Sequence, residues 1–454
     1  MSNTKQEFLN EVKPLVQSLL DYATNDGAQF NITDAKVTVS LSDQVEFEIE
    51  KGKVSTSSSG KSCGVGVSLY SGDRFLSFSL NTLDEALLKE AMLENMKAIK
   101  LAPENPSKAL PDPSLIYKGP DYDLDSYDVT PVDEGQLVQY AIDMEQEALS
   151  VPGIKGTRSV SVSKSMSHLY TKATNGLEIY DNGTGYQAHG QIVAADANGM
   201  EIDHEGSMAT HFSDMACPKV TGRMAAENAL SRLSSSLPKT GSMPIILSPA
   251  AAATLIGSVF QAIDGTSIYQ DRSFLKDKIG KQVMNKGVTI VDDPTIKRGL
   301  RSGTVDSAGM KQDPITFIED GILKSYNVGL QESRELGIAP IGRNSGTTNI
   351  CVMPGDKTPD ELMADIKDGI YVEGFNGGTA DVNNGSHSRQ AHGHKIKDGK
   401  VTKDAVSGFV VAGNLKDMFM KVVLANDTPQ LPHPRHSSSI PTMRLDDLTI
   451  SGGM

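Results

Sequence analysis

The sequence predicts an α+β protein with two parts: an amino-terminal domain of helices and antiparallel sheet, and a carboxyl-terminal strand-rich domain, barrel-like or sandwich-like. Apolar residues recur at helical spacing near the amino terminus, and several long segments alternate apolar and polar residues with the period of a strand. Asn-Gly and Asp-Gly pairs punctuate those segments as turns. A chain of 454 residues also exceeds the roughly 250 to 300 residues at which one hydrophobic core stops growing.

The first hundred residues predict a helix, a set of strands and a second helix. Residues 1–23 carry apolar side chains three and four positions apart between charged ones, which indicates an amphipathic helix rather than a signal peptide. Residues 36–80 alternate as half-buried strands. Thr82 and Glu85 have the spacing of a capping box, so a helix is expected to begin at Thr82.

Residues 101–131 contain six prolines and are expected to form an extended seam between sub-domains. Thr130-Pro131 predicts the start of another helix, and residues of about 157–212 predict an antiparallel meander. The expected turns of this meander are at Asn175-Gly176, Asp181-Asn182-Gly183 and Asn198-Gly199. After a helix at about 218–235, LPKTGSM is the expected boundary between an amino-terminal domain, residues 1–238, and a carboxyl-terminal domain, residues 242–454.

The boundary leads into MPIILSPAAAATLIGSVFQAIDG, residues 243–265, a buried strand followed by an uncharged helix. Ser248-Pro249 is a strong helix start, since the hydroxyl caps free amides and proline suits the first helical position. Because the helix at 249–263 carries no charge, we expect it to line the interior or a subunit-facing cavity. Further on, the sequence predicts hairpins at Glu319-Asp320-Gly321 and Asp398-Gly399 and a helix capped by Thr358.

The composition argues against nucleic-acid and membrane partners. Lys plus Arg number 43 against 57 Asp plus Glu, a net charge of −14 that a nucleic-acid surface would repel. No apolar run approaches the roughly 18 to 20 residues that span a bilayer. Three scattered cysteines suit a reducing compartment, so we expect a cytoplasmic protein.

The histidines are the first candidates for a metal site. His204-Glu205 and His211 are too far apart on a helix, about 10 Å along the axis, so a surface or turn role is expected. His433 and His436 lie in a Pro/Ser-rich segment that is expected to be a flexible tail or loop.

The segment SHSRQAHGHK offers a more serious metal site. His392 and His394 could point to one side of a strand, with His387 before an adjacent turn, and two imidazoles could hold zinc if a third ligand arrived. The alternative is a Gly-rich loop with solvated side chains. The preceding Gly-rich segment, residues 372–386, lacks the spacing of a phosphate loop and is also expected to be a loop.

Several stretches resemble the PmbA/TldD family, whose members were once named modulators of DNA gyrase. The resemblance is dense from about residue 240 to the carboxyl end and extends in layout to residues 36–100. The stretches are MPIILSP, DRSFLKDKIG to ITFIEDGILKSY at residues 271–326, ELGIAPIGRN, GNLKDMF and PTMRLDDLTISGG.

The catalytic branch of that family carries H-E-x-x-x-H on the helix after the strand that resembles MPIIL. Its two histidines bind zinc, a cysteine near the carboxyl end adds a ligand, and the glutamate acts as base. In this sequence Gly257 and Ser258 stand at the first His and the Glu, and Ala262 stands at the second His. The segment NDTPQLPHPRHSSSIPTMRL contains no cysteine. The resemblance therefore implies the PmbA/TldE-like branch with a degenerate zinc motif.

What the resemblance implies is a zinc-dependent metalloprotease with one subunit of each branch, which cleaves unstructured peptides in peptide-antibiotic maturation and antitoxin degradation. This chain would be the non-catalytic, peptide-binding subunit without a cofactor of its own, and the TldD-like partner of the heterodimer would hold the zinc. Two alternatives stay open: a metalloprotease in its own right that uses a different metal site, with His387, His392 and His394 as candidates, and a self-associating peptide-binding module. A homodimer when the partner is missing is also open.

Overall fold

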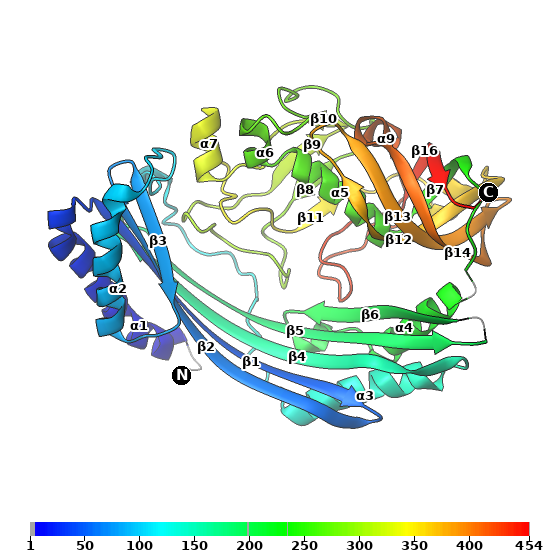
Figure 1. The fold of residues 1–454 in the computed structure, drawn as a ribbon, viewed down its shortest axis with the longest axis horizontal. Helices are drawn as coiled ribbons and strands as arrows, with labels where there is room; N and C mark the ends of the chain where they lie inside the picture. The colour runs from blue at the N-terminus through cyan, green and yellow to red at the C-terminus, as the bar shows by residue number, and fades with distance from the viewer. Residues whose placement is uncertain (1–4, 198, 234, 454) are drawn as a thin grey trace.

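The computed structural model describes residues 5–197, 199–233 and 235–453 and has a curved sheet set against a strand-rich domain (Figure 1). The helices are α1 (Lys5–Asn25), α2 (Glu85–Ala98), α3 (Glu134–Ser150), α4 (Pro218–Leu233), α5 (Pro249–Ala262), α6 (Gly265–Tyr269), α7 (Leu330–Leu336), α8 (Pro359–Met363) and α9 (Leu415–Lys421). The amino-terminal strands are β1 (Asp34–Glu50), β2 (Lys53–Ser71), β3 (Arg74–Leu80), β4 (Ile154–Ala173), β5 (Glu178–Ala195) and β6 (Met200–Ala209). The carboxyl-terminal strands are β7 (Gly241–Leu247), β8 (Ile290–Asp292), β9 (Ile315–Glu319), β10 (Ile322–Leu323), β11 (Ile350–Val352), β12 (Asp368–Ala380), β13 (Ser386–Lys397), β14 (Lys400–Asn414), β15 (Val423–Leu424) and β16 (Met443–Ser451).

The amino-terminal sheet is antiparallel throughout, in the order β3-β2-β1-β4-β5-β6. One of its faces is apolar because alternate residues of each strand point the same way. On β1, Val37 and Val39 belong to the core under α1 and α2, and Phe47 and Ile49 belong to the core under α3. Helices α1, α2 and α3 lie on the outer, convex side (Figure 1), and α4 packs against α3, β5 and β6.

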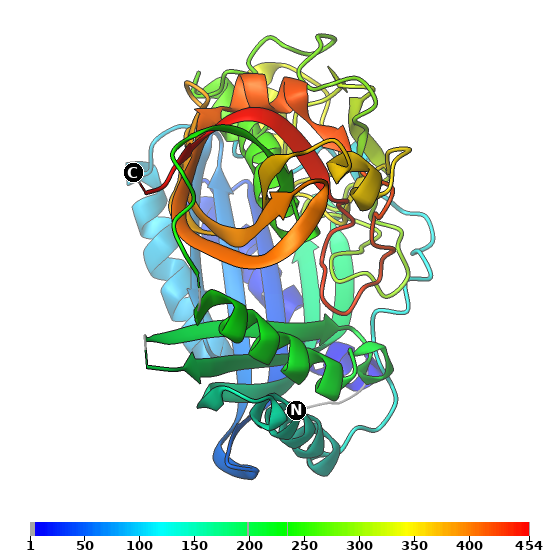
Figure 2. The same ribbon diagram turned by 90° about the vertical axis from the view of Figure 1, so that its right-hand side faces the viewer.

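The opposite face of this sheet is built from small polar residues and faces the carboxyl-terminal domain (Figures 1 and 2). The strand register brings serines, threonines and glycines side by side on it, and two of its hydroxyl pairs, Thr38 with Thr171 and Ser42 with Ser62, lie 2.9 and 2.7 Å apart. We call this surface the polar face; it comprises Thr38, Ser40, Ser42, Ser62, Gly64, Gly66, Ser163, Ser165, Ser167, Thr171, Gly183 and Gly185.

The carboxyl-terminal domain contains a closed barrel of β7, β12, β13, β14 and β16, visible as a ring in Figure 2. The pairing of β14 with β16 closes it, and β7 with β12 is its parallel pair. Ile245 and Leu247 of β7 share one core with α5, whereas Ile246 between them packs with α8 on the other side of the barrel wall. The α+β fold class and the strand-rich second part are therefore confirmed.

Several local predictions are confirmed. Ser248 caps α5, Thr358 forms a capping box with Glu361, and the hairpins lie at Asp320-Gly321 and Asp398-Gly399. No helix in the described part of the chain is long and apolar enough to cross a membrane.

Two helix starts were predicted wrongly. The second helix begins at Glu85, because Asp84 accepts hydrogen bonds from the amides of Ala86 and Leu87, so no capping box forms from Thr82 to Glu85. The third begins at Glu134 rather than after Thr130, because Asp133 and Gln136 form the capping box. In both cases a second capping residue lies closer to the helix than the predicted one.

Two turns and loops were also predicted wrongly. Asp181-Asn182-Gly183 lies inside β5, paired with Leu169, His168 and Ser167 of β4, and only Asn175-Gly176 forms the β4–β5 turn. The Gly-rich residues 372–380 belong to β12. The strand has bulges between Val372 and Gly374 and between Phe375 and Gly377. Asn198 of the third predicted turn lies outside the described residues.

Candidate functional site

Helix α5 carries the three positions at which the family's zinc motif would stand. Ser248 Oγ donates to the carbonyl of Glu373 at 2.7 Å, which fixes the start of the helix against β12. Ser258 and Ala262 are 1% and 0% exposed, so both face the barrel core, as expected for an uncharged helix. Gly257 differs, because a Cβ built there would meet no atom within 4 Å.

These residues do not fit a zinc ion. A catalytic zinc site needs three protein ligands from His, Cys or carboxylate side chains. Gly257 and Ala262 offer no donor atom, and the Ser258 hydroxyl donates to the Thr254 carbonyl at 3.4 Å within the helix. Over the described ranges no three His, Cys, Asp or Glu side chains are grouped so as to hold a metal ion.

The three histidines of SHSRQAHGHK lie on a strand, β13, and not in a solvated loop. His387 is 2% exposed and its ring lies 5.9 Å from that of Phe375, edge to face. His387 and Ala391 share the core side of β13, whereas His392 and His394 alternate to the other side. The strand thus separates His387 from the other two.

His392 and His394 have partners on the outer side of the barrel. Nε2 of His392 lies 2.7 Å from a guanidinium nitrogen of Arg232 on α4, and burial together with this cation lowers the pKa of His392 to about 4. Nδ1 of His394 lies 3.2 Å from Glu373, whose hydrogen bond raises the pKa of His394. His392 therefore helps to join the two parts of the protein.

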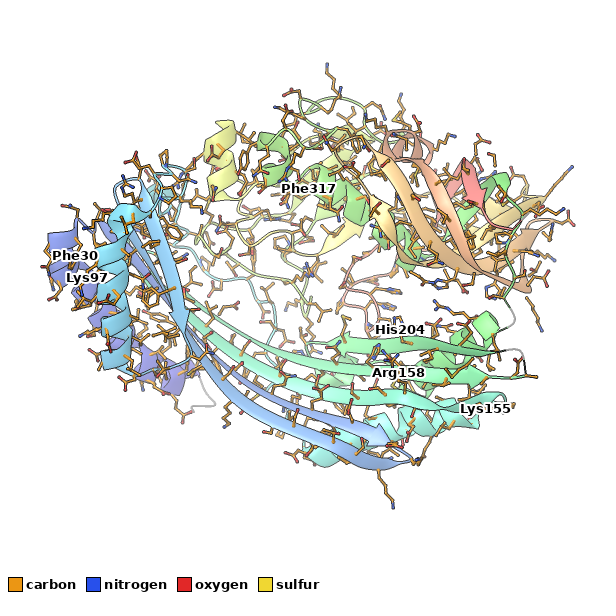
Figure 3. All side chains as sticks on the ribbon, in the orientation of Figure 1. Phe30, Lys97, Lys155, Arg158, His204 and Phe317 are labelled. Carbon is orange, nitrogen blue, oxygen red and sulfur yellow. The ribbon has the colours of Figure 1, made fainter. Side chains whose placement is uncertain are left out.

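Four of the remaining histidines form two pairs of neighbouring rings, distant in sequence from the family's motif positions on α5. Figure 3 shows His204 on β6, where its ring lies 5.4 Å from that of His189. The rings of His433 and His436 stack at 4.5 Å, in a loop that accepts a hydrogen bond from β6 at Pro434. Burial raises the pKa of the Cys351 thiol to about 11, which makes this thiol a poor nucleophile at neutral pH.

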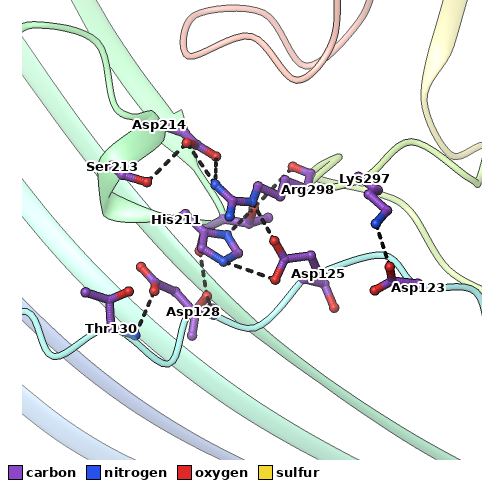
Figure 4. A network of polar contacts seen from close by, with 12 residues as sticks. Asp123, Asp125, Asp128, Thr130, His211, Ser213, Asp214, Lys297 and Arg298 are labelled. Atoms are coloured by element: carbon purple, nitrogen blue, oxygen red, sulfur yellow. Dashed lines mark hydrogen bonds and ion pairs between the residues drawn. The ribbon is translucent and has the colours of Figure 1, made fainter.

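A polar network joins the seam, the sheet and the carboxyl-terminal domain (Figure 4). Arg298 Nε donates to Asp125 at 2.7 Å, and another of its nitrogens lies 3.1 Å from both carboxylate oxygens of Asp214. His211, buried at the turn after β6, lies 3.5 Å from Asp125. The hydrogen bond from Arg298 lowers the pKa of Asp125, so this carboxylate stays charged. The sequence did not reveal this network, because its members come from three distant segments.

The outer edge of β2 is the second feature of functional interest. β3 pairs with β2 only over residues 65–71, so residues 53–64 have β1 on one side and no other strand of the described chain on the outer side. This part of β2 is almost entirely exposed and rich in serine. A free edge of this length presents backbone donors and acceptors to an extended chain.

The chain thus combines a curved sheet that has a free edge with a closed barrel, and the buried helix α5 carries no metal ligand at Gly257, Ser258 and Ala262. Residues 35–102, 127–233 and 240–452 match domain 1, the central domain and the C-terminal domain of the PmbA/TldA metallopeptidases. The chain belongs to this PmbA/TldD family, and the resemblance seen in the sequence is confirmed.

The relatives include members of both branches. The chain is 26% identical over 458 residues to the metalloprotease PmbA homolog of Haemophilus influenzae, covering 97% of this chain and 96% of the relative. It is 27% identical over 405 residues to the metalloprotease PmbA of Escherichia coli O157:H7, covering 87% of each. The metalloprotease TldD homolog of H. influenzae is 28% identical over 251 residues, 50% of this chain and 52% of that protein.

Solved structures share the whole architecture. A Bacteroides thetaiotaomicron protein described as a modulator of DNA gyrase superimposes with a TM-score of 0.90 at 25% identity, covering 98% of this chain and 99% of that chain. TldE from Thermococcus kodakarensis has a TM-score of 0.81 at 18% identity, with 96% and 100% covered, which establishes the shared fold.

Proposed function

We propose that this chain is the non-catalytic, peptide-binding subunit of a TldD/TldE-type zinc-dependent metalloprotease. One observation carries the proposal: all three domains of a metallopeptidase family are present, yet Gly257, Ser258 and Ala262 provide no metal ligand on α5. Hydrolysis of a peptide at neutral pH requires an activated water, and in this family a metal ion is the agent expected. A TldD-like partner would supply it.

The fold supports a role in holding an extended peptide. The free edge of β2 at residues 53–64 can pair with a peptide backbone irrespective of most of its sequence. The polar face beside it offers hydroxyls and glycines, which permit close approach of a backbone and hydrogen-bond to it. Unstructured peptides are the substrates that such an edge accepts, since most backbone donors and acceptors of a folded protein are already paired.

A heterodimer in the cytoplasm is the assembly we propose. H. influenzae has both a PmbA homolog and a TldD homolog, and this chain is similar to both, along almost its whole length to the former and along half to the latter. Peptide-antibiotic maturation and antitoxin degradation are the processes proposed for the pair. The three cysteines are free thiols, which suits a reducing compartment.

The test combines elemental analysis with a cleavage assay. Purified without chelator, the chain alone is expected to hold no stoichiometric zinc and to leave an unstructured peptide intact, and cleavage is expected only after a TldD-like homologue is added. One zinc per chain, together with chelator-sensitive cleavage by the chain alone, would overturn the proposal. If that zinc were lost in His392→Ala or His394→Ala, these histidines would form the metal site.

A further inference from the structure

A cavity of about 510 Å³ lies where the polar face meets the seam and the carboxyl-terminal domain. Its floor includes Lys36 and Thr38 of β1, Thr171 of β4 and Asp181 of β5. Residues 121–127 of the seam and 302–307 of the carboxyl-terminal domain also line the cavity, as does Lys5 of α1. The cavity therefore lies between the amino-terminal sheet, the seam and the carboxyl-terminal domain.

Three carboxylates in this wall have partners within the protein. Asp123 pairs with Lys297 and Asp125 with Arg298. Asp306 accepts hydrogen bonds from three backbone amides. The pairs of Asp123 and Asp125 join the seam to the carboxyl-terminal domain, whereas Asp306 is held by amides within that domain.

Four charged side chains in the wall have no ion pair among the described residues: Lys5, Lys36, Asp121 and Asp181. The Lys5 ammonium group lies over the Tyr180 ring, 4.4 Å from its centroid. Lys36 is half-buried, and burial alone lowers the pKa of its ammonium group, since no carboxylate lies near enough to raise it. Asp181 accepts one hydrogen bond, from the amide of Asn182 at 2.9 Å. Desolvation by the surrounding wall, and then the neighbouring carboxylate of Asp121, raises the pKa of Asp181. The unpaired charge of Lys36 is half-buried and therefore costly, so a ligand that neutralises it is favoured. Asp121 and Asp181 are exposed and can accept a cationic group of a ligand.

The strand register sets the distance between Lys36 and Asp181. Lys36 lies opposite Ala173 and Asp181 lies opposite Leu169, so they are two strands apart and four residues apart along the strands. These offsets are roughly 10 Å and roughly 13 Å. After the length of the side chains is subtracted, room remains for a chain of about two or three residues at roughly 3.3 Å each. The hydroxyls of Thr38 and Thr171 lie between the ends.

We infer that this cavity binds a short peptide with free ends, its α-carboxylate at Lys36 and its α-ammonium group at Asp121 and Asp181. The choice of ligand class rests on the proposed peptide function, but the site belongs to this chain alone and needs neither partner nor metal. Such ligands are the products that a peptidase releases. The polar face would thus lead from the free edge of β2 to a site for released product.

The test is calorimetric titration of the isolated chain with trialanine, N-acetyl-trialanine and trialanine amide. Trialanine is expected to bind, and blocking either end is expected to weaken binding about tenfold, the loss of one charge-assisted contact. Lys36→Met should weaken trialanine binding about tenfold while leaving the binding of trialanine amide unchanged. Asp181→Asn should also weaken trialanine binding about tenfold, while leaving the binding of N-acetyl-trialanine unchanged.

Lys100→Met, at an exposed lysine outside the cavity, is the matched control and should bind like wild type. The inference is overturned if folded wild-type protein binds no trialanine at millimolar concentration, or if blocked and free peptides bind equally to all variants. Because no partner or zinc is present, such a failure leaves the proposed protease role untouched. Conversely, a failed cleavage assay does not bear on this site.

Discussion

The guanidinium group of Arg343 and the carboxylate of Asp292 form an ion pair in which both side chains are fully buried. The remaining nitrogens of Arg343 donate to the carbonyls of Gly342 at 2.9 Å and Asp313 at 2.7 Å. The second oxygen of Asp292 accepts from the amide and hydroxyl of Thr348 at 2.8 and 2.7 Å. The pair thus joins β8 to two distant loops with its polar atoms satisfied.

Asp292→Ala should destabilise the protein strongly, because it leaves the Arg343 charge buried without a partner. The expected loss in unfolding free energy is about 3 to 5 kcal/mol, measured by urea denaturation. Asp368→Ala removes the partner of Lys397 in an exposed pair and should cost less than about 1 kcal/mol. Equal losses in the two variants would show that burial is not what makes the Arg343 pair important.

Ser258→Asp should destabilise the fold on the order of 1 to 3 kcal/mol, because Ser258 is 1% exposed and a carboxylate there would lose its hydration. Gln261→Asp places the same charge on the exposed side of the same helix and is the control. Thermal melts compare the two. An unchanged melting temperature for Ser258→Asp would mean that this side of α5 is open to water.

Acidification should destabilise the protein in part through His387. Burial, with Arg389 as a smaller cause, lowers the pKa of His387 to about 4, whereas an unfolded histidine titrates near 6.5. Between these values the unfolded chain binds a proton that the folded chain does not, so unfolding free energy falls as the pH falls. From pH 7 to 5, wild type should lose about 2 kcal/mol more than His387→Leu.

Urea denaturation at both pH values checks this prediction, with His204→Leu as the control at an exposed histidine. That control should keep the wild-type pH dependence. If His387→Leu also keeps it, His387 is protonated in the folded protein at pH 5.

Arg298→Met should loosen the contact between the domains, because it leaves Asp125 and Asp214 without their shared cation. The expected loss of unfolding free energy is about 1 to 2 kcal/mol. Hydrogen exchange should become faster at residues 123–128 and 211–214. Lys297→Met, at the neighbouring exposed pair, should change neither quantity appreciably.

The features of the fold that could be predicted are those set by neighbours in sequence. The alternation in β1, the cap at Ser248 and the Asp-Gly hairpins depend on a few consecutive residues, and the structure has them. Thr82 and Asp84 are both good capping residues, and only the path of the chain decides between them. The serine-rich edge of β2 was predicted as a half-buried strand; it is a strand, but residues 53–62 are exposed because β3 does not extend along this part of β2.

The candidate site was only partly predictable, for a similar reason. The absence of zinc ligands on α5 could be inferred by comparing Gly257, Ser258 and Ala262 with a known pattern. The cavity could not, because Lys36, Asp121 and Asp181 meet only through the register of β1, β4 and β5 and the path of the seam. His387 looked solvated among polar neighbours, although strand alternation buries it on the core side of β13.

The closure of the barrel has a consequence for how the protein is made. β7 pairs with β16, which joins residue 247 to residue 443, so the ribosome completes nearly the whole carboxyl-terminal domain before the barrel can form. At about 5 to 20 residues per second, the apolar helix α5 leaves the ribosome about 10 to 40 seconds before its enclosing wall exists. During that interval the finished amino-terminal sheet is the structured surface beside the nascent chain. The apolar side chains of α5 therefore lack part of their final packing partners until β16 has been made.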